Sequence, residues 1–205
     1  TSGMLAVDLK NRIKKSGPIP FSDFVESCLY DLDDGFYSKR GSAGRRGDFL
    51  TSPEVGPFFG SLIANWLDDV WLKLNKPENF QVVEVGAGRG TLARSVIDAQ
   101  PCCLENGTYT MVERSNKLRV AQPVSEILFS TNEMPEAPVV GAVIANELLD
   151  NLPFDLLEGD GECWKEVHIG LIGDQFVEIL MGESRESVEV PPLKGSRIPI
   201  QTEAH

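Results

Sequence analysis

A glycine-rich stretch near the middle of this chain has the residue types and spacing to hold a cofactor. An apolar run leads into Glu84, and glycines then follow at alternate positions. Glycine lets the backbone turn sharply and approach a ligand where a Cβ atom would collide. The pattern predicts a cradle for a nucleoside-bearing cofactor, although a tight turn from strand to helix with a chance acid would look similar. The residues of the predicted cradle are Gly86, Ala87, Gly88 and Gly90.

The spacing of these glycines narrows the choice of cofactor. A phosphate-binding P-loop requires G-x-x-x-x-G-K-[ST], and a dinucleotide site requires G-x-G-x-x-G, whereas this chain has G-x-G-x-G. Glu84 is expected at the carboxyl end of its strand, where ligands bind in open α/β sheets. A carboxylate there would repel a pyrophosphate and attract an ammonium group. The sequence therefore favours S-adenosylmethionine, which carries an ammonium group and a sulfonium.

A second acid supports a nucleoside site. The segment Tyr109–Val112 has the character of a short strand, and Glu113 follows it directly. This position is about as far from the glycines as the ribose-binding acid of a nucleotide-binding βαβ unit. We expect Glu113 to accept hydrogen bonds from the ribose hydroxyls. A solvated glutamate at a strand end is the alternative interpretation. We also assign Arg114, Thr51 and Ser52 to the cofactor site.

Polar residues follow a third expected strand. Asn146, Glu147 and Asp150 come directly after the apolar run 139–145. The carboxyl ends of parallel strands face the cofactor, so these residues are candidates for acceptor chemistry. For Asp150, a capped turn leading out of the sheet is an equal alternative. Amino-methyltransferases that act on DNA or RNA place N-P-P-Y or D-P-P-Y here, so the sequence disfavours that class.

The composition limits the partners and the compartment. The 205 residues have a formal net charge of −12, which argues against a nucleic-acid partner because such binding neutralises phosphates. No apolar run approaches the roughly 18 residues of a membrane span. The four cysteines form no C-x-x-C pattern, which indicates reduced thiols in a cytosol-like compartment. A zinc site or a Ser-His-Asp triad would depend on His168, because His205 ends the chain, and we predict neither.

The expected elements describe an α/β fold. The apolar run 139–145 predicts a buried parallel strand, and the wide apolar stripe of the helix ending near Leu74 predicts core packing. Ser22 is expected to cap the first helix. Alternating residues on both sides of Gly173-Asp174 predict a β-hairpin. The expected helices cover about 22–30, 55–74, 91–100 and 115–118, and the expected strands about 82–85, 109–113, 127–130, 139–145, 164–172 and 175–181.

Three segments together resemble the MidA family of S-adenosylmethionine-dependent methyltransferases. They are E-V-G-A-G-R-G-T at 84–91, G-D-F-L-T-S-P-E at 47–54 and N-E-L-L-D-N-L-P at 146–153. The resemblance covers nearly the whole chain. It implies the class I (Rossmann-like) methyltransferase sheet, with an N-terminal helical cap over 1–76 and a cofactor-binding α/β domain over 77–205. The mitochondrial member of the family is a protein arginine methyltransferase and an assembly factor of respiratory complex I.

The resemblance implies methyl transfer to an arginine of a protein substrate, by analogy a subunit of the respiratory chain. Carboxylates can orient a guanidinium and receive its proton. For this role we choose Glu147 and Asp150 first, with Asn146 beside them, and Glu54 and Asp48 second. The alternatives are a methyltransferase for a small molecule or RNA, and a non-catalytic assembly factor with a cofactor pocket. The expected location is the bacterial cytoplasm or the mitochondrial matrix.

The chain departs from the family pattern in two places. Family members are longer, and the last strands of the sheet are expected to be missing after residue 205. About ten residues separate Ser115 from Ser125, which is short for a helix and its loops between two parallel strands. We therefore expect a truncated or cleaved chain, with an exposed strand edge.

Overall fold

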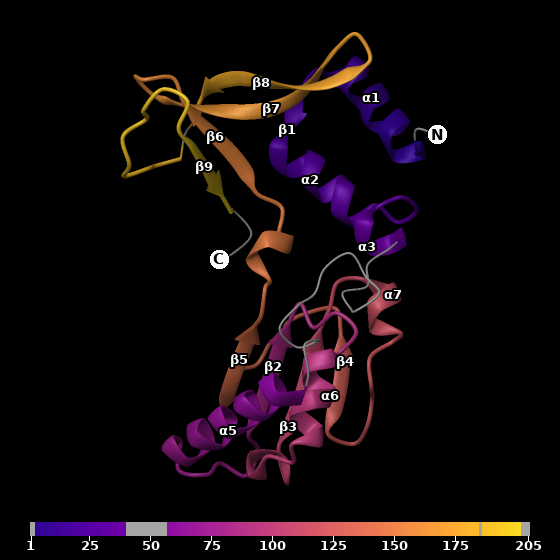
Figure 1. Ribbon diagram of the computed structural model, residues 1–205, viewed down its shortest axis with the longest axis vertical. Helices are drawn as coiled ribbons and strands as arrows, with labels where there is room; N and C mark the ends of the chain where they lie inside the picture. Colours follow the sequence, from indigo (N-terminus) through magenta and orange to yellow (C-terminus); the bar gives the residue numbers. More distant parts are fainter. Residues whose placement is uncertain (1–2, 40–56, 185, 202–205) are drawn as a thin grey trace. The chain divides into compact units, whose positions relative to one another are not determined.

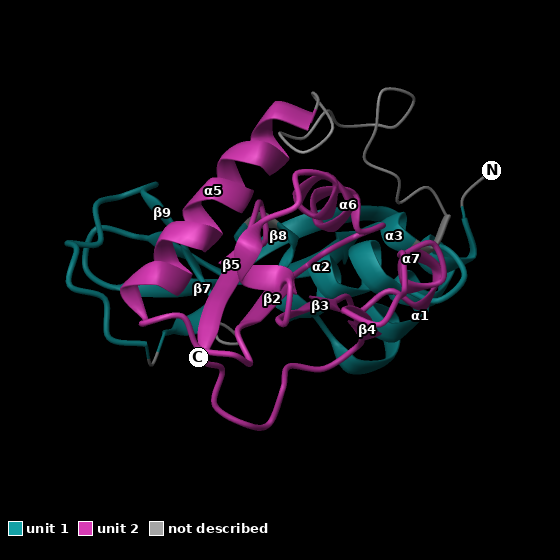
Figure 2. Ribbon diagram, turned by 90° about the horizontal axis from the view of Figure 1, so that it is seen from below, with its two compact units in different colours: residues 1–39, 149–205 teal, residues 40–148 magenta. Residues whose placement is uncertain are grey.

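The computed structural model describes residues 3–39, 57–184 and 186–201. Its contacts divide the chain into two compact units. The first unit combines the two ends of the sequence, residues 1–39 and 149–205, and the second is the continuous segment 40–148 (Figure 2). This division differs from the expected boundary at residue 76, because the long helix α5 (Pro57–Lys73) packs with α6, β5 and η1 of the second unit.

The second unit contains a four-stranded parallel sheet in the order β4-β3-β2-β5 (Figure 1). The class I methyltransferase type of α/β fold predicted from the sequence agrees with this parallel sheet. Its strands are β2 (Gln81–Val85), β3 (Thr108–Val112), β4 (Leu128–Thr131) and β5 (Gly141–Ala145). Its helical segments are α5, α6 (Thr91–Asp98), the 3-10 turn η1 (Cys102–Leu104) and α7 (Asn116–Arg119).

One face of this sheet forms the main core with α5 and α6. The register aligns Val82 with Tyr109 and with Ala142, so their side chains share this face. All three are buried, as are Leu67 of α5 and Val96 of α6. Because parallel strands are joined by crossovers that lie on the sheet, this packing fixes the carboxyl ends of the strands at one edge.

Two expectations about this core need correction. The apolar stripe of α5 is only partly buried: Gly60, Ala64 and Leu67 face the core, whereas Phe58 is 75% and Trp66 45% exposed. The strand at 139–145 was expected to be buried, but β5 pairs with β2 alone among the described strands. As a result Val143, on the face away from α5 and α6, is 53% exposed.

The first unit is built around an antiparallel sheet. Its order is β1-β7-β6-β9, and β8, outside this order, also pairs with β7. The β7–β8 pair confirms the hairpin predicted around Gly173-Asp174. The strands are β1 (Ile19–Pro20), β6 (Asp155–Gly159), β7 (Trp164–Ile172), β8 (Gln175–Glu183) and β9 (Arg197–Ile200). The helical segments are α1 (Met4–Ser16), α2 (Phe21–Tyr30), α3 (Phe36–Lys39) and η2 (Leu149–Asn151).

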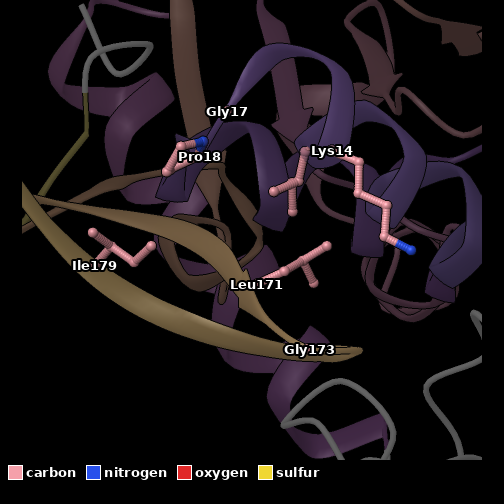
Figure 3. A pocket seen from close by; sticks show the side chains of 7 residues that line it. Lys14, Gly17, Pro18, Leu171, Gly173 and Ile179 are labelled. Atoms are coloured by element: carbon pink, nitrogen blue, oxygen red, sulfur yellow. The ribbon is translucent and has the colours of Figure 1, made fainter.

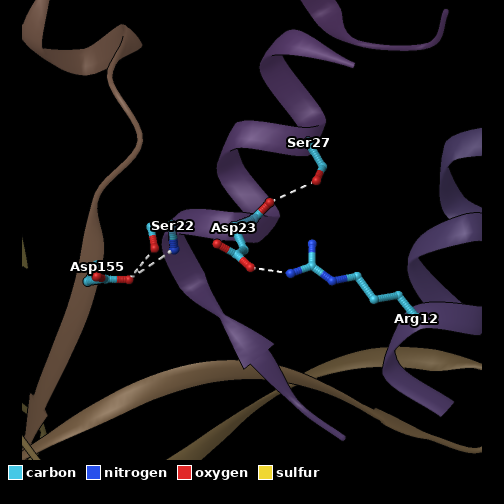
Figure 4. A network of polar contacts seen from close by, with 5 residues as sticks. All are labelled: Arg12, Ser22, Asp23, Ser27 and Asp155. Carbon is cyan, nitrogen blue, oxygen red and sulfur yellow. Dashed lines mark hydrogen bonds and ion pairs between the residues drawn. The ribbon is translucent and has the colours of Figure 1, made fainter. Parts of the chain in front are cut away.

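Apolar and polar contacts join the two segments of the first unit. Phe24 of α2 meets Phe176 of β8 edge-on, with 5.5 Å between ring centroids. Asp155 of β6 accepts hydrogen bonds from both the backbone N–H and the hydroxyl of Ser22 (Figure 4). The expectation that Ser22 caps α2 is therefore wrong: Ser22 lies inside the first turn, and the capping carboxylate comes from the distant Asp155.

Candidate functional site

The glycine loop joins the end of β2 to the start of α6. All three glycines have positive φ, at 71° for Gly86, 55° for Gly88 and 74° for Gly90, a region that favours glycine. The backbone N–H groups of Gly86 and Ala87 both donate to the carbonyl of Val112, at 2.9 and 3.1 Å. These hydrogen bonds hold the loop against the carboxyl end of β3.

The three glycines are needed for different reasons. A Cβ atom on Gly86 would lie 2.8 Å from Cδ1 of Leu148, and one on Gly90 would lie 2.7 Å from the sulfur of Met111. A side chain at either position would therefore displace its neighbours and would be strained by the positive φ. At Gly88, no heavy atom of the described residues lies within 4 Å of the Cβ position. The loop is open there, at the sheet edge where ligands of such folds bind.

Glu113 lies directly beside this open position. Its carboxylate accepts hydrogen bonds from the backbone N–H of Gly88 at 2.9 Å and from that of Ser115 at 2.7 Å. Arg119 donates to the backbone carbonyls of Glu113 at 2.6 Å and of Arg114 at 2.8 Å. The structure thus brings the second predicted acid to the glycine loop, with 8% of the residue exposed. Its ribose contact remains a prediction, as does the cofactor contact of the exposed Arg114.

Glu84 lies below the loop and not on its surface. It is 5% exposed and shares the face of Met111, which packs against the helices. The Tyr109 hydroxyl donates to its carboxylate at 2.9 Å. The pKa of Glu84 is raised to about 7, chiefly by burial; hydrogen bonds from Tyr109 and from the backbone of Ala93 oppose this rise, and the charge of Glu113 adds to it. A direct role with the cofactor remains a prediction.

A buried glutamine that sequence patterns did not single out also contacts the loop. Gln122 is 7% exposed, and its Nε2 donates to the carbonyl of Gly88 at 2.9 Å. The hydroxyl of Ser130 on β4 donates to its Oε1. Gln122 belongs to the short connection between β3 and β4 and to no recognised motif. The one sequence signal was the unusual shortness of that connection.

Two of the acceptor candidates, Asn146 and Glu147, follow β5 in the second unit. Leu148 packs on Gly86, which places the turn at Asn146 and Glu147 next to the glycine loop. Glu147 is exposed and has a φ of 53°, which is uncommon for a residue with a side chain and often marks a functional position. The side chain of Asp150 and the predicted site residues Asp48, Thr51, Ser52 and Glu54 lie outside the described residues.

A separate cavity of about 340 Å³ lies in the first unit (Figure 3). Its lining is mainly apolar and contains one ionisable residue, Lys14, so it lacks the groups for acid–base chemistry. The residues that line it are Ile13, Lys14, Gly17, Pro18, Leu171, Gly173 and Ile179. In the part of the chain that the structure describes, no three His, Cys, Asp or Glu residues group as a metal site would require. Within the same residues, no helix has the length and apolar character to cross a bilayer.

Comparison with known proteins identifies the family. Residues 62–198 match the family model described as "Putative S-adenosyl-L-methionine-dependent methyltransferase". The chain belongs to this family. The match runs from within α5 into β9 and includes the glycine loop, Glu113 and Glu147, and it confirms the resemblance predicted from the motifs.

Members of the family in animals carry a more specific name. The chain is 39% identical over 136 residues to a Drosophila melanogaster protein named "Protein arginine methyltransferase NDUFAF7 homolog, mitochondrial", covering 65% of this chain and 31% of that protein. It is 38% identical over 233 aligned positions to the Xenopus tropicalis protein named "Protein arginine methyltransferase NDUFAF7, mitochondrial", covering 88% of this chain and 53% of that protein.

Solved structures support the fold assignment. A family member from Burkholderia thailandensis bound to S-adenosyl-homocysteine superposes with a TM-score of 0.75 at 27% identity, over 89% of this chain and 50% of that one. A second structure from the same organism gives a TM-score of 0.78 at 26% identity, over 97% and 55%. The chain spans about half the length of these relatives. Its family is therefore one of S-adenosylmethionine-dependent methyltransferases with the α/β fold predicted from the sequence.

Proposed function

We propose that the protein is an S-adenosylmethionine-dependent methyltransferase that methylates an arginine of a protein substrate. The observation that carries this proposal is Gly88: its open Cα lies at the carboxyl edge of a parallel sheet, with its N–H held at 2.9 Å by the carboxylate of Glu113. The description of the family and the names of the animal relatives support the reaction and the acceptor.

The residues of the second unit supply the cofactor cradle in this proposal. Gly86, Ala87, Gly88 and Gly90 form its floor. Each oxygen of Glu113 already accepts one backbone hydrogen bond and can accept another, so ribose hydroxyls can bind without displacing the loop. Glu84 lies buried beneath this floor, where its pKa is raised to about 7. Arg114, Thr51 and Ser52 complete the predicted contacts.

The acceptor side depends on carboxylates after β5. The cofactor, when bound, supplies an electrophilic methyl group on a sulfonium. An arginine guanidinium stays protonated at neutral pH, with a pKa above roughly 12, and is a poor nucleophile. A carboxylate can grip it bidentately, aim one nitrogen and take up the proton released on methylation. We assign this role to Glu147 and Asp150, with Asn146 beside them and Glu54 and Asp48 as second choices.

The location and the partner follow from the relatives. Their names place the animal proteins in mitochondria, and we extend the mitochondrial matrix to this protein as part of the proposal, with the bacterial cytoplasm as the alternative. The proposed partner is a protein that presents an arginine, by family analogy a subunit of the respiratory chain.

A substitution at Glu147 tests the reaction. Glu147→Gln keeps the size of the side chain and removes its charge, so we expect the methylation rate to fall at least about 100-fold while cofactor affinity stays within about twofold. Methyl transfer from radiolabelled cofactor to proteins of an extract lacking the enzyme measures the rate, and mass spectrometry identifies methylarginine. Isothermal titration with S-adenosyl-homocysteine measures the affinity.

Two matched variants make the result specific. Glu105→Gln alters an exposed glutamate next to η1 and should leave both the rate and the affinity unchanged. Gly86→Val should abolish cofactor binding, because a β-branched residue is strained at a φ of 71° and its side chain would displace Leu148. Equal losses of rate and affinity in Glu147→Gln would contradict the assigned role. Label that appears on RNA or on a small molecule, and not on protein, would contradict the proposed acceptor.

A further inference from the structure

The connection between β3 and β4 packs against the glycine loop. Arg94 of α6 donates to the carbonyl of Ala121 at 2.6 Å. Cδ of Pro123 lies 2.8 Å from the position that a Cβ atom on Gly90 would take. Only the single-turn helix α7 interrupts this parallel crossover within the described residues. The connection is unexpectedly short for a pair of parallel strands. It contacts both the glycine loop and α6 and so supports the loop from one side.

The side chain of Gln122 points from this connection to the loop. A buried amide without hydrogen bonds is strongly destabilising, so its partners determine how it lies. The carbonyl of Gly88 can only accept a hydrogen bond, so it fixes Nε2 as the atom that faces the loop. The Ser130 hydroxyl donates to Oε1 and holds the other side of the amide. Ser130 therefore keeps the amide of Gln122 in this orientation.

Gly88 is consequently held at both of its backbone polar groups. Glu113 binds its N–H at 2.9 Å and Gln122 binds its carbonyl at 2.9 Å, so the peptide planes before and after its Cα are both fixed. We propose that Gln122, oriented by Ser130, is a positioning residue for the cofactor. It keeps the open face of the glycine loop formed before the cofactor arrives. This inference rests on the proposed function.

The physical reason for such a residue lies in glycine itself. Glycine populates many backbone conformations, so a loop of alternating glycines loses much entropy when it is ordered. If the protein itself orders the loop before binding, the cofactor does not have to offset this loss of entropy. Without Gln122, the peptide after Gly88 can rotate, and binding must then restore its orientation.

Substitutions at Gln122 and Ser130 test the proposal. Gln122→Met keeps the approximate shape and removes the donor, so we expect the Kd for S-adenosyl-homocysteine to rise about tenfold. Ser130→Ala removes the orienting hydroxyl and should raise Kd about threefold. Because Ser130 acts through Gln122, the double variant should bind no more weakly than Gln122→Met alone. Isothermal titration measures all four proteins.

A spectroscopic measurement separates positioning from general destabilisation. In cofactor-free protein, Gln122→Met should shift the carbonyl ¹³C resonance of Gly88 and the amide ¹⁵N resonance of Arg89, which share one peptide group. Leu104→Ala removes a buried side chain from η1. It should lower the melting temperature while leaving both resonances and the Kd unchanged. Gln175→Met, on the exposed start of β8, should change none of these quantities.

Each outcome bears on a different claim. An unchanged Kd in Gln122→Met would overturn the positioning role, and additive effects in the double variant would overturn the part assigned to Ser130. If Gln122→Met does not fold, Gln122→Asn, which is one methylene shorter, and Ser130→Ala take its place with the same expectations. A wild-type protein that does not bind S-adenosyl-homocysteine would overturn the proposed function itself, together with this role.

Discussion

Glu84 lies near the carboxyl end of its strand, as predicted, but its environment differs from the prediction. The acid before the first glycine was expected at the surface of the cofactor site, yet its carboxylate lies in the core beside Tyr109. The phenol stays protonated because burial raises the pKa of Tyr109 well above its ordinary value. Tyr109 is therefore a constant donor, and Glu84 is the member of the pair that titrates near neutral pH.

The raised pKa of Glu84 predicts how stability depends on pH. The folded protein holds the proton up to about pH 7, against an ordinary value of 4.5, so the free energy of unfolding should fall as pH rises through this window. At roughly 1.4 kcal/mol per pKa unit, the full loss is about 3 kcal/mol. Glu84→Gln keeps an acceptor for Tyr109 and does not titrate. We expect it to unfold at higher urea than wild type at pH 8, but not at pH 4.5.

Urea denaturation at both pH values, with the exposed Glu105→Gln as control, checks this prediction. A difference between wild type and Glu84→Gln that is equal at the two pH values would show that Glu84 does not titrate in this window.

Sequence reasoning reached the residues of the site that belong to motifs. The glycine spacing and the acid after β3 identified the loop and its neighbour Glu113, because these depend on local backbone geometry. Gln122 was missed because its importance comes from contacts with Gly88 and Ser130, which no spacing along the chain reveals. The exposed Glu147 was predicted by position, and its positive φ became visible only in the structure.

At the scale of elements, the close approach of α5 and α6 depends on one small residue. A Cβ atom on Gly60 would lie 2.2 Å from the hydroxyl oxygen and 2.7 Å from the backbone carbonyl carbon of Ser95. The two helices therefore pack almost backbone to backbone. This contact supports α6, whose first turn begins at the end of the glycine loop.

A larger side chain at Gly60 should force the helices apart. We expect Gly60→Val to lower the free energy of unfolding by about 1–3 kcal/mol through overpacking. Gly182→Val on β8 is the matched control, because no described atom lies near its Cβ position. Chemical denaturation followed by circular dichroism compares the two variants. Equal stability of Gly60→Val and wild type would mean that α5 can move without cost.

Most elements with a local signal were predicted, although the helix α1 (Met4–Ser16) was missed, and the pairings between distant segments were not predicted. The hairpin and the parallel strands have clear patterns of apolar residues and turns. The pairing of β6 with β9 and of β1 with β7 joins segments far apart in the sequence. The apolar stripe of α5 could not show which part faces the sheet, because Phe58 and Gly60 differ in burial for reasons of packing and not of hydropathy.

At the scale of the whole molecule, the chain has two cores. Leu67, Val82 and Tyr109 belong to that of the second unit, and Leu9, Ile13 and Ile169 to that of the first. A unit that has its own core can unfold independently, in a separate cooperative transition. The proposed cofactor cradle lies in the second unit, so the cofactor should act first on the stability of that unit.

Calorimetry tests this division. We expect two thermal transitions, and S-adenosyl-homocysteine at 100 times its Kd should stabilise the second unit by about 2.7 kcal/mol. Gly86→Val, which should not bind the ligand, serves as the control and should show no shift. A single transition, with or without ligand, would show that the two cores unfold together.

The discontinuous first unit has a consequence for how the protein is made. Its N-terminal helices leave the ribosome about 110 residues before the strands that complete their core, a delay of roughly 5–20 s at ordinary rates of translation. Phe21 cannot contact Phe154, and Phe24 cannot contact Phe176, until those later residues have been synthesised. The continuous cofactor unit is synthesised meanwhile and can fold first. The nascent chain therefore exposes these apolar side chains until residues 149–205 have been made, and we expect a chaperone to bind them during that time.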